Sequence, residues 1–149
     1  MHSFDVSRTS DKSVQTLWNV LADFPNIADW NPGVRASAST SVEPTGLGAT
    51  RTCDVGPGAK LEETIREWHE PNRMVVTIDK AKMLPIKTAS VEFSLNEAGT
   101  ATEIGIKYSW EMKGGSFGNL FAPLMKMPLK KGMKGFLDSW HDAAQPVAV

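Results

Sequence analysis

The spacing of the apolar residues changes twice along the chain, and these changes predict its elements. Apolar residues first recur at the i, i+3, i+4, i+7 spacing of one buried helical face, at Val14, Leu17, Trp18 and Leu21. Ser10 can cap this helix with its hydroxyl. Asp23, ahead of Phe24-Pro25, predicts the start of a second short helix, because proline is well tolerated in a first turn. The sequence therefore predicts two short helices within residues 10–28.

From residue 33 to residue 112 apolar and polar residues alternate, which is the spacing of strands with one buried face. Turn sequences such as Gly46-Leu47-Gly48 and Gly56-Pro57-Gly58 separate these runs. With a first strand ahead of the helices, the predicted strands are His2–Arg8, Gly33–Val42, Ala49–Val55, Lys60–Trp68, Arg73–Asp79, Thr88–Asn96 and Thr102–Met112. Strands that follow one another through short turns predict one antiparallel sheet.

A long amphipathic helix over residues 117–143 is the last predicted element. Its apolar set is Phe117, Leu120, Phe121, Leu124, Met125, Met133, Phe136, Leu137 and Trp140. Pro128 lies inside this pattern and predicts a kink or a break, because proline removes one backbone hydrogen bond. Four lysines, Lys126, Lys130, Lys131 and Lys134, fall largely on the opposite side. They are interpreted as a solvated face or as a contact for a membrane surface or an anionic partner.

Length and charge limit the class of protein. The 149 residues predict one domain over residues 1–144, followed by a flexible tail at 145–149. The net charge of −1 argues against nucleic acid as a partner. No apolar run approaches the roughly 18 residues of a membrane span, and the N-terminal residues lack a secretory pattern, so we expect a cytoplasmic protein without stable membrane insertion. The oligomeric state stays open.

Few residues point to chemistry. The chain has one cysteine, Cys53, and no histidine pair at metal spacing, nucleophile elbow or phosphate-binding glycine loop, so we expect no metal and no cofactor. Glu63 shares its strand face with Leu61 and Ile65 and should point inward. A buried carboxylate without a partner holds its proton more strongly, which suits an acid/base group or a polar anchor. The alternative is an ion pair with Arg51 or Arg66.

The order of elements and several sequence segments together resemble a known superfamily. The segments are 14–24, Trp30-Asn31-Pro32-Gly33-Val34, 46–51, 63–68 and Leu84-Pro85. The chain is similar throughout to the helix-grip fold, an α+β architecture also called START-like or SRPBCC. Birch-pollen allergens, START lipid-transfer domains and plant abscisic-acid receptors share it. The segments look most like the bacterial polyketide cyclase/dehydrase branch.

The resemblance implies a seven-stranded curved antiparallel sheet around the C-terminal helix, with two short helices after the first strand. It also implies an apolar cavity between sheet and helix, although the same residues could fill a solid core. In plant hormone receptors of this fold, a glutamate occupies the strand position that matches Glu63, and the loops that match Gly56–Gly58 and Lys82–Pro85 gate the pocket. The expected wall residues are Asn31, Glu63, Ile65, Ile78, Met83, Leu84, Ile106, Tyr108, Trp110, Phe117, Phe121, Met125 and Phe136.

Two functions follow from the resemblance. The first is the binding or carriage of a hydrophobic small molecule, such as a lipid, an isoprenoid or an aromatic metabolite. The second is a polyketide cyclase or dehydratase activity in the same cavity, with Glu63 as acid/base and Tyr108 as its helper. Because this fold carries both kinds of function, the resemblance alone does not choose between them. We expect binding, since only one acid/base candidate stands out.

Overall fold

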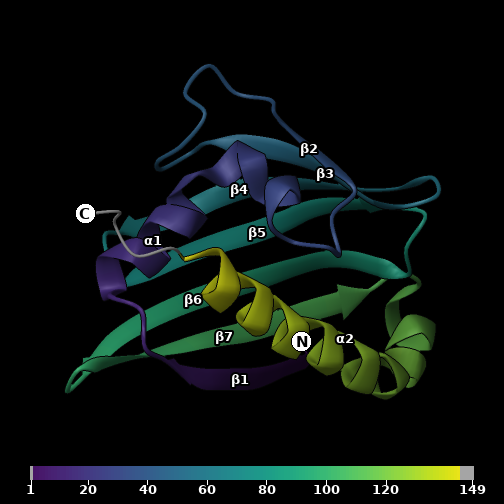
Figure 1. The fold of residues 1–149 in the computed structure, drawn as a ribbon. Helices are drawn as coiled ribbons and strands as arrows, with labels where there is room; N and C mark the ends of the chain where they lie inside the picture. The colour runs from purple at the N-terminus through teal and green to yellow at the C-terminus, as the bar shows by residue number, and fades with distance from the viewer. Residues whose placement is uncertain (1, 145–149) are drawn as a thin grey trace.

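The structure is a computed structural model that describes residues 2–144. One seven-stranded antiparallel sheet has the order β1-β7-β6-β5-β4-β3-β2, and its curved inner face holds the long helix α2 (Figure 1). The strands are β1 (His2–Ser10), β2 (Ala36–Ser39), β3 (Thr50–Gly56), β4 (Ala59–His69), β5 (Arg73–Lys82), β6 (Ile86–Ala98) and β7 (Ala101–Met112). The helices are α1 (Val14–Ala22), the 3-10 helix η1 (Phe24–Asp29) and α2 (Gly115–Ala143). The predicted helix-grip fold is therefore confirmed.

The sheet owes part of its curvature to irregular pairing between β4 and β5. The register between these strands shifts at Glu62/Glu63 and again at Ile65/Glu67. Such bulges bend a strand and increase its twist. The inner face then closes around a core whose largest fully buried side chains include Trp18, Trp110 and Trp140. Within residues 2–144, no helix is long and apolar enough to cross a membrane.

The second strand is shorter than predicted. The alternation over residues 33–42 predicted a strand along this whole run, but β2 covers only Ala36–Ser39 and lies at the edge of the sheet. Its side chains are small and mostly exposed, and Val42 beyond it is 96% exposed. Little apolar surface is buried there, so the alternation alone does not extend the pairing.

Ser13, not Ser10, caps α1. The Ser13 hydroxyl accepts a hydrogen bond from the Thr16 backbone N–H at 3.1 Å. Ser10 instead ends β1, and its Oγ is hydrogen-bonded to His141 Nδ1 at 2.6 Å. The predicted cap was three residues early because β1 runs on to residue 10. The second helix is η1, and Asp23 precedes it without a capping bond from its side chain.

Helix α2 runs without interruption from Gly115 to Ala143 and includes both Pro123 and Pro128. The predicted alternative of a break at Pro128 is therefore wrong. Figure 1 shows that the helix changes direction in its first, greener turns. The end of α2 is anchored in the core, where Trp140 Nε1 donates to the Leu17 carbonyl of α1 at 2.8 Å. The predicted tail at 145–149 lies outside the described residues.

Candidate functional site

A cavity of about 240 Å³ lies between the inner face of the sheet and α2. Its wall comes from strands β3 to β7, from the η1–β2 region and from the second half of α2. Most of the wall is aliphatic or aromatic, and the polar side chains are Asn31, Arg51, Glu63 and Tyr108. The other lining residues are Ile27, Gly33, Val34, Val55, Leu61, Val76, Ile78, Val91, Phe93, Gly132, Met133 and Phe136.

Arg51 and Glu63 form a buried ion pair in this wall. They are direct cross-strand partners in β3 and β4, and Arg51 Nη2 lies 2.8 Å from Glu63 Oε1. Arg51 also donates from Nη1 to the Phe24 carbonyl at 2.7 Å, and its guanidinium carbon lies 3.8 Å from the centre of the Phe24 ring. Arg51 is 6% exposed and Glu63 is 7% exposed, so both charges are held almost without water. The expectation of an unpaired Glu63 carboxylate is therefore wrong, and the alternative, an ion pair with Arg51, is correct.

One donor of this ion pair has no partner. Arg51 Nε is buried, and within residues 2–144 it makes no hydrogen bond. Leaving a buried donor unpaired costs about 1–3 kcal/mol.

Tyr108 is a neutral hydrogen-bonding group. Burial raises the pKa of its phenol, and the nearby Glu63 carboxylate raises it further, so the hydroxyl keeps its proton at neutral pH. The Tyr108 ring is nearly parallel to that of Phe4, with 5.6 Å between ring centres, which holds it in place. Burial also raises the pKa of the Cys53 thiol, and Glu63 adds to the effect. A protonated thiol is a poor nucleophile, which agrees with the interpretation of Cys53 as a packed side chain.

Five of the predicted wall residues line the cavity: Asn31, Glu63, Ile78, Tyr108 and Phe136. Three others, Ile65, Ile106 and Trp110, are fully buried in the core outside the cavity wall. The indole N–H of Trp110 has no hydrogen-bond partner within the described residues. Leu84 and Met125 are only partly buried against the core.

The placement of the remaining three residues differs from the prediction. Met83 is 73% exposed, Phe117 is 74% exposed and Phe121 is 46% exposed. Met83 occupies a tight turn with a positive φ of 64°, which turns its side chain to solvent. For the two phenylalanines the reason is the rotation of α2, whose core side carries Gly118 and Ala122 at these turns. The gating loops predicted at 56–58 and 82–85 also contribute no wall residue.

Sequence reasoning gave too little weight to Arg51. Along residues 49–53 the buried Ala49, Arg51 and Cys53 alternate with the half-exposed Thr50 and Thr52. The alternating threonines were the available signal for the outward face. The opposing position of Glu63 depends on the β3–β4 register, which the sequence does not state.

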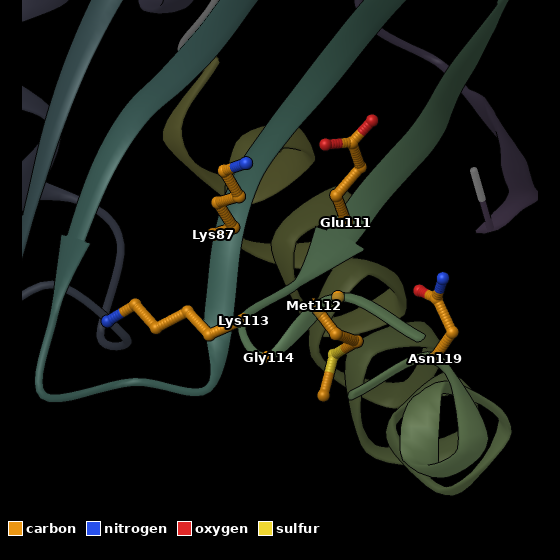
Figure 2. Close-up of a pocket in the computed structure, with 7 residues that line it drawn as sticks. Lys87, Glu111, Met112, Lys113, Gly114 and Asn119 are labelled. Atoms are coloured by element: carbon orange, nitrogen blue, oxygen red, sulfur yellow. The ribbon is translucent and has the colours of Figure 1, made fainter. Parts of the chain in front are cut away.

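A larger hollow, of about 510 Å³, lies where β6, β7 and the start of α2 meet (Figure 2). Figure 2 shows that its polar side chains do not all converge, because Lys113 extends away from Lys87, Glu111 and Asn119. The Lys113 ammonium donates instead to the Ala81 carbonyl at 2.7 Å. Converging polar groups are what a specific small-molecule site needs, so the smaller inner cavity is the better candidate. Within residues 2–144, no group of three or more potential metal ligands is found.

The family model described as "Polyketide cyclase / dehydrase and lipid transport" matches residues 1–145 of the chain. The chain belongs to this family. The description of the polyketide cyclase/dehydrase and lipid transport family covers both catalysis and transport, so membership leaves the activity of this chain open. No protein of curated function matches the sequence.

Solved structures are similar to this member of the family over nearly the whole chain. Ara h 8.0201 has a TM-score of 0.78 at 14% identity, with 96% of this chain and 97% of that chain covered. TTHA0849 from Thermus thermophilus has a TM-score of 0.78 at 13% identity, with 96% of this chain and 97% of that chain covered. The Zhui aromatase/cyclase from Streptomyces sp. R1128 has a TM-score of 0.81 at 11% identity, with 96% of this chain and 93% of that chain covered. At these identities the likeness concerns the fold.

Proposed function

We propose that this protein binds a small, mostly apolar molecule in the inner cavity and orients it through one polar group. The observation that carries the proposal is the composition of the cavity wall, which is mostly hydrophobic and has four polar side chains, Asn31, Arg51, Glu63 and Tyr108. Apolar surface supplies affinity, and a few placed polar groups supply orientation. The Tyr108 hydroxyl, which keeps its proton, can donate to an acceptor on the ligand.

The size of the cavity limits the ligand. At about 240 Å³ it is below the roughly 300–1,000 Å³ of pockets that hold drug-sized molecules. A molecule of one or two rings therefore fits better than a complete two-chain lipid. We expect a phenol, a small aromatic ketone or a short isoprenoid alcohol, each of which joins an apolar body to one oxygen.

The alternative function is a cyclase or dehydratase reaction in the same cavity, which the family description and the polar side chains of the wall favour. Catalysis of this kind needs a group that exchanges protons near neutral pH. Glu63 is held by Arg51, and the raised pKa of Tyr108 keeps its proton in place. Binding without catalysis agrees better with this arrangement.

The experiment is a nuclear magnetic resonance titration with 2-naphthol and with 2-methylnaphthalene, which have similar shapes and differ in one hydroxyl. We expect both to perturb residues of the cavity wall, and 2-naphthol to bind about fivefold more tightly, since one hydrogen bond contributes roughly 1 kcal/mol. Tyr108→Phe should reduce this preference and leave the affinity for 2-methylnaphthalene unchanged. Equal affinities for the two compounds in the wild-type protein would contradict the polar anchor.

A pair of glycine variants tests whether binding takes place in the cavity. Gly132 lines the cavity and Gly135 does not, and a Cβ atom at either position would meet no atom within 4 Å. Gly132→Leu should therefore fill the cavity and weaken both probes by at least about tenfold, while Gly135→Leu should bind as the wild-type protein does. Equal binding by the two variants would place the ligand elsewhere.

The enzyme alternative has its own test. A linear poly-β-ketone is incubated with the wild-type protein and with Glu63→Gln, and cyclised products are followed by mass spectrometry. Acceleration by the wild-type protein that falls about 10²–10⁴-fold in the variant would favour catalysis over simple binding. No acceleration by either protein is the result expected for a binding protein.

A further inference from the structure

The first half of α2 presents large apolar side chains to solvent. Phe117, Leu120, Leu124 and Met127 are each 72–74% exposed, and Phe121 is 46% exposed. These five residues are called the α2 apolar patch below. The rings of Phe117 and Phe121 contact each other edge to face, with 5.4 Å between their centres, so the patch is continuous at this point. Several large apolar side chains gathered on one face are typical of an interaction surface.

The outward direction of the patch is imposed by the packing of the helix. Gly118 and Ala122 are buried on the opposite side of the same turns. A Cβ atom at Gly118 would lie 1.9 Å from the Lys113 carbonyl oxygen, so only glycine lets this turn of α2 pack so closely against the segment that precedes the helix. The small residues therefore face the protein, and the large ones have no partner within residues 2–144 other than one another.

The charged residues in the chain segment that carries the patch have one sign. Between Glu111 and Asp138 the sequence contains five lysines, at 113, 126, 130, 131 and 134, and no aspartate or glutamate. The whole chain has a net charge of −1, so this positive charge is local. Lys126, Lys131 and Lys134 are exposed on the turns around and after the patch. Long lysine side chains can keep their ammonium groups in the headgroup layer while nearby apolar residues enter the acyl region.

We propose that the first half of α2 docks on an anionic lipid surface, with the α2 apolar patch at the boundary between headgroups and acyl chains and the lysines on the lipid phosphates. Apolar area and electrostatic attraction together give interfacial helices their affinity. The lysines favour this partner over a second copy of the chain, because a self-complementary contact would bring two sets of like charges together. The site is separate from the cavity and would bring the cavity close to a membrane.

The experiment is flotation of the full chain with two kinds of vesicle, one of phosphatidylcholine alone and one of phosphatidylcholine mixed with phosphatidylglycerol. We expect binding to the mixed vesicles that weakens as salt is added. Phe117→Ser combined with Leu124→Ser should reduce it at least about 100-fold, since each buried apolar side chain contributes roughly 1.5–3 kcal/mol and about 1.4 kcal/mol is tenfold in affinity. Lys131→Gln combined with Lys134→Gln should reduce it about 10- to 30-fold, at roughly 1 kcal/mol for each lysine.

Matched controls separate the patch from general effects. Leu47→Ser removes an apolar side chain outside the patch that is 72% exposed. Lys60→Gln combined with Lys107→Gln removes two exposed lysines from strands. Both controls should bind as the wild-type protein does. Unchanged secondary structure by circular dichroism shows that the patch variants are folded. Absence of binding to mixed vesicles, or equal loss in patch and control variants, would overturn the proposal. So would a dimer in sedimentation analysis that Phe117→Ser with Leu124→Ser abolishes, because the patch would then join two copies.

Discussion

The buried ion pair between Arg51 and Glu63 allows a quantitative test of how the cavity wall is held. Both side chains are less than 10% exposed, so removal of either partner leaves a charge that water cannot reach. Glu63→Gln keeps an oxygen that can still accept from Arg51 but removes the negative charge. Arg51→Met removes the positive charge together with the hydrogen bond to the Phe24 carbonyl and the contact with the Phe24 ring. We therefore expect the arginine variant to lose more stability.

The magnitudes follow from these contacts. Breaking one partner of a buried ion pair costs about 3–5 kcal/mol in the free energy of unfolding. Glu63→Gln should lie near 3 kcal/mol, because an acceptor remains. Arg51→Met should lie near 5 kcal/mol, because a hydrogen bond of about 1 kcal/mol and a cation–π contact of about 0.5–2 kcal/mol are lost as well. The double variant Arg51→Met with Glu63→Leu has no buried charge and should lie within about 2 kcal/mol of the wild-type protein.

The assay is urea unfolding at neutral pH, followed by tryptophan fluorescence and by circular dichroism. Asp138→Asn serves as the control, because it breaks the surface ion pair between Arg8 and Asp138. The Arg8 side chain is 32% exposed and that of Asp138 is 67% exposed, so the loss should cost less than about 1 kcal/mol. If Glu63→Gln costs no more than Asp138→Asn, the pair is not desolvated as described. A double variant less stable than both single variants would show that the two charges are not coupled.

Two further predictions concern stability. Because burial raises the pKa values of both Cys53 and Tyr108, the native state keeps protons that the unfolded chain releases above about pH 9 for the thiol and pH 10 for the phenol. The free energy of unfolding, measured by urea unfolding at a series of alkaline pH values, should therefore fall as the pH rises through this range. It should fall less steeply in Cys53→Ala and in Tyr108→Phe, and a free energy that does not change with pH would contradict the prediction. Gly118→Ala should destabilise the protein by about 1–3 kcal/mol because its Cβ meets the Lys113 carbonyl. Gly135→Ala should stabilise it by up to about 1 kcal/mol, and equal thermal midpoints for the two variants would refute the packing argument.

The alternation of apolar residues was sufficient to predict most of the sheet, because each strand has one face that must leave water. The predicted strand over residues 102–112 matches β7 to within one residue, since Ile104, Ile106, Tyr108 and Trp110 all face the core. The long helix and the helical pair before β2 also follow from their spacing. Glu63 could be placed on the inner face for the same reason, because side-chain direction in a strand has a period of two.

The sequence could not decide which residues meet. Arg51 and Glu63 are twelve positions apart, and only the β3–β4 register puts one opposite the other, so the partner of the predicted carboxylate depended on the sheet. Likewise, α2 carries apolar residues around most of its first half, and the spacing alone made Phe117 and Phe121 candidate cavity residues. In the structure Gly118 and Ala122 occupy the buried side of these turns, and the two phenylalanines lie on the outer side. Period and composition are local properties of the chain, whereas register and helix rotation are set by contacts between segments that only the folded structure brings together.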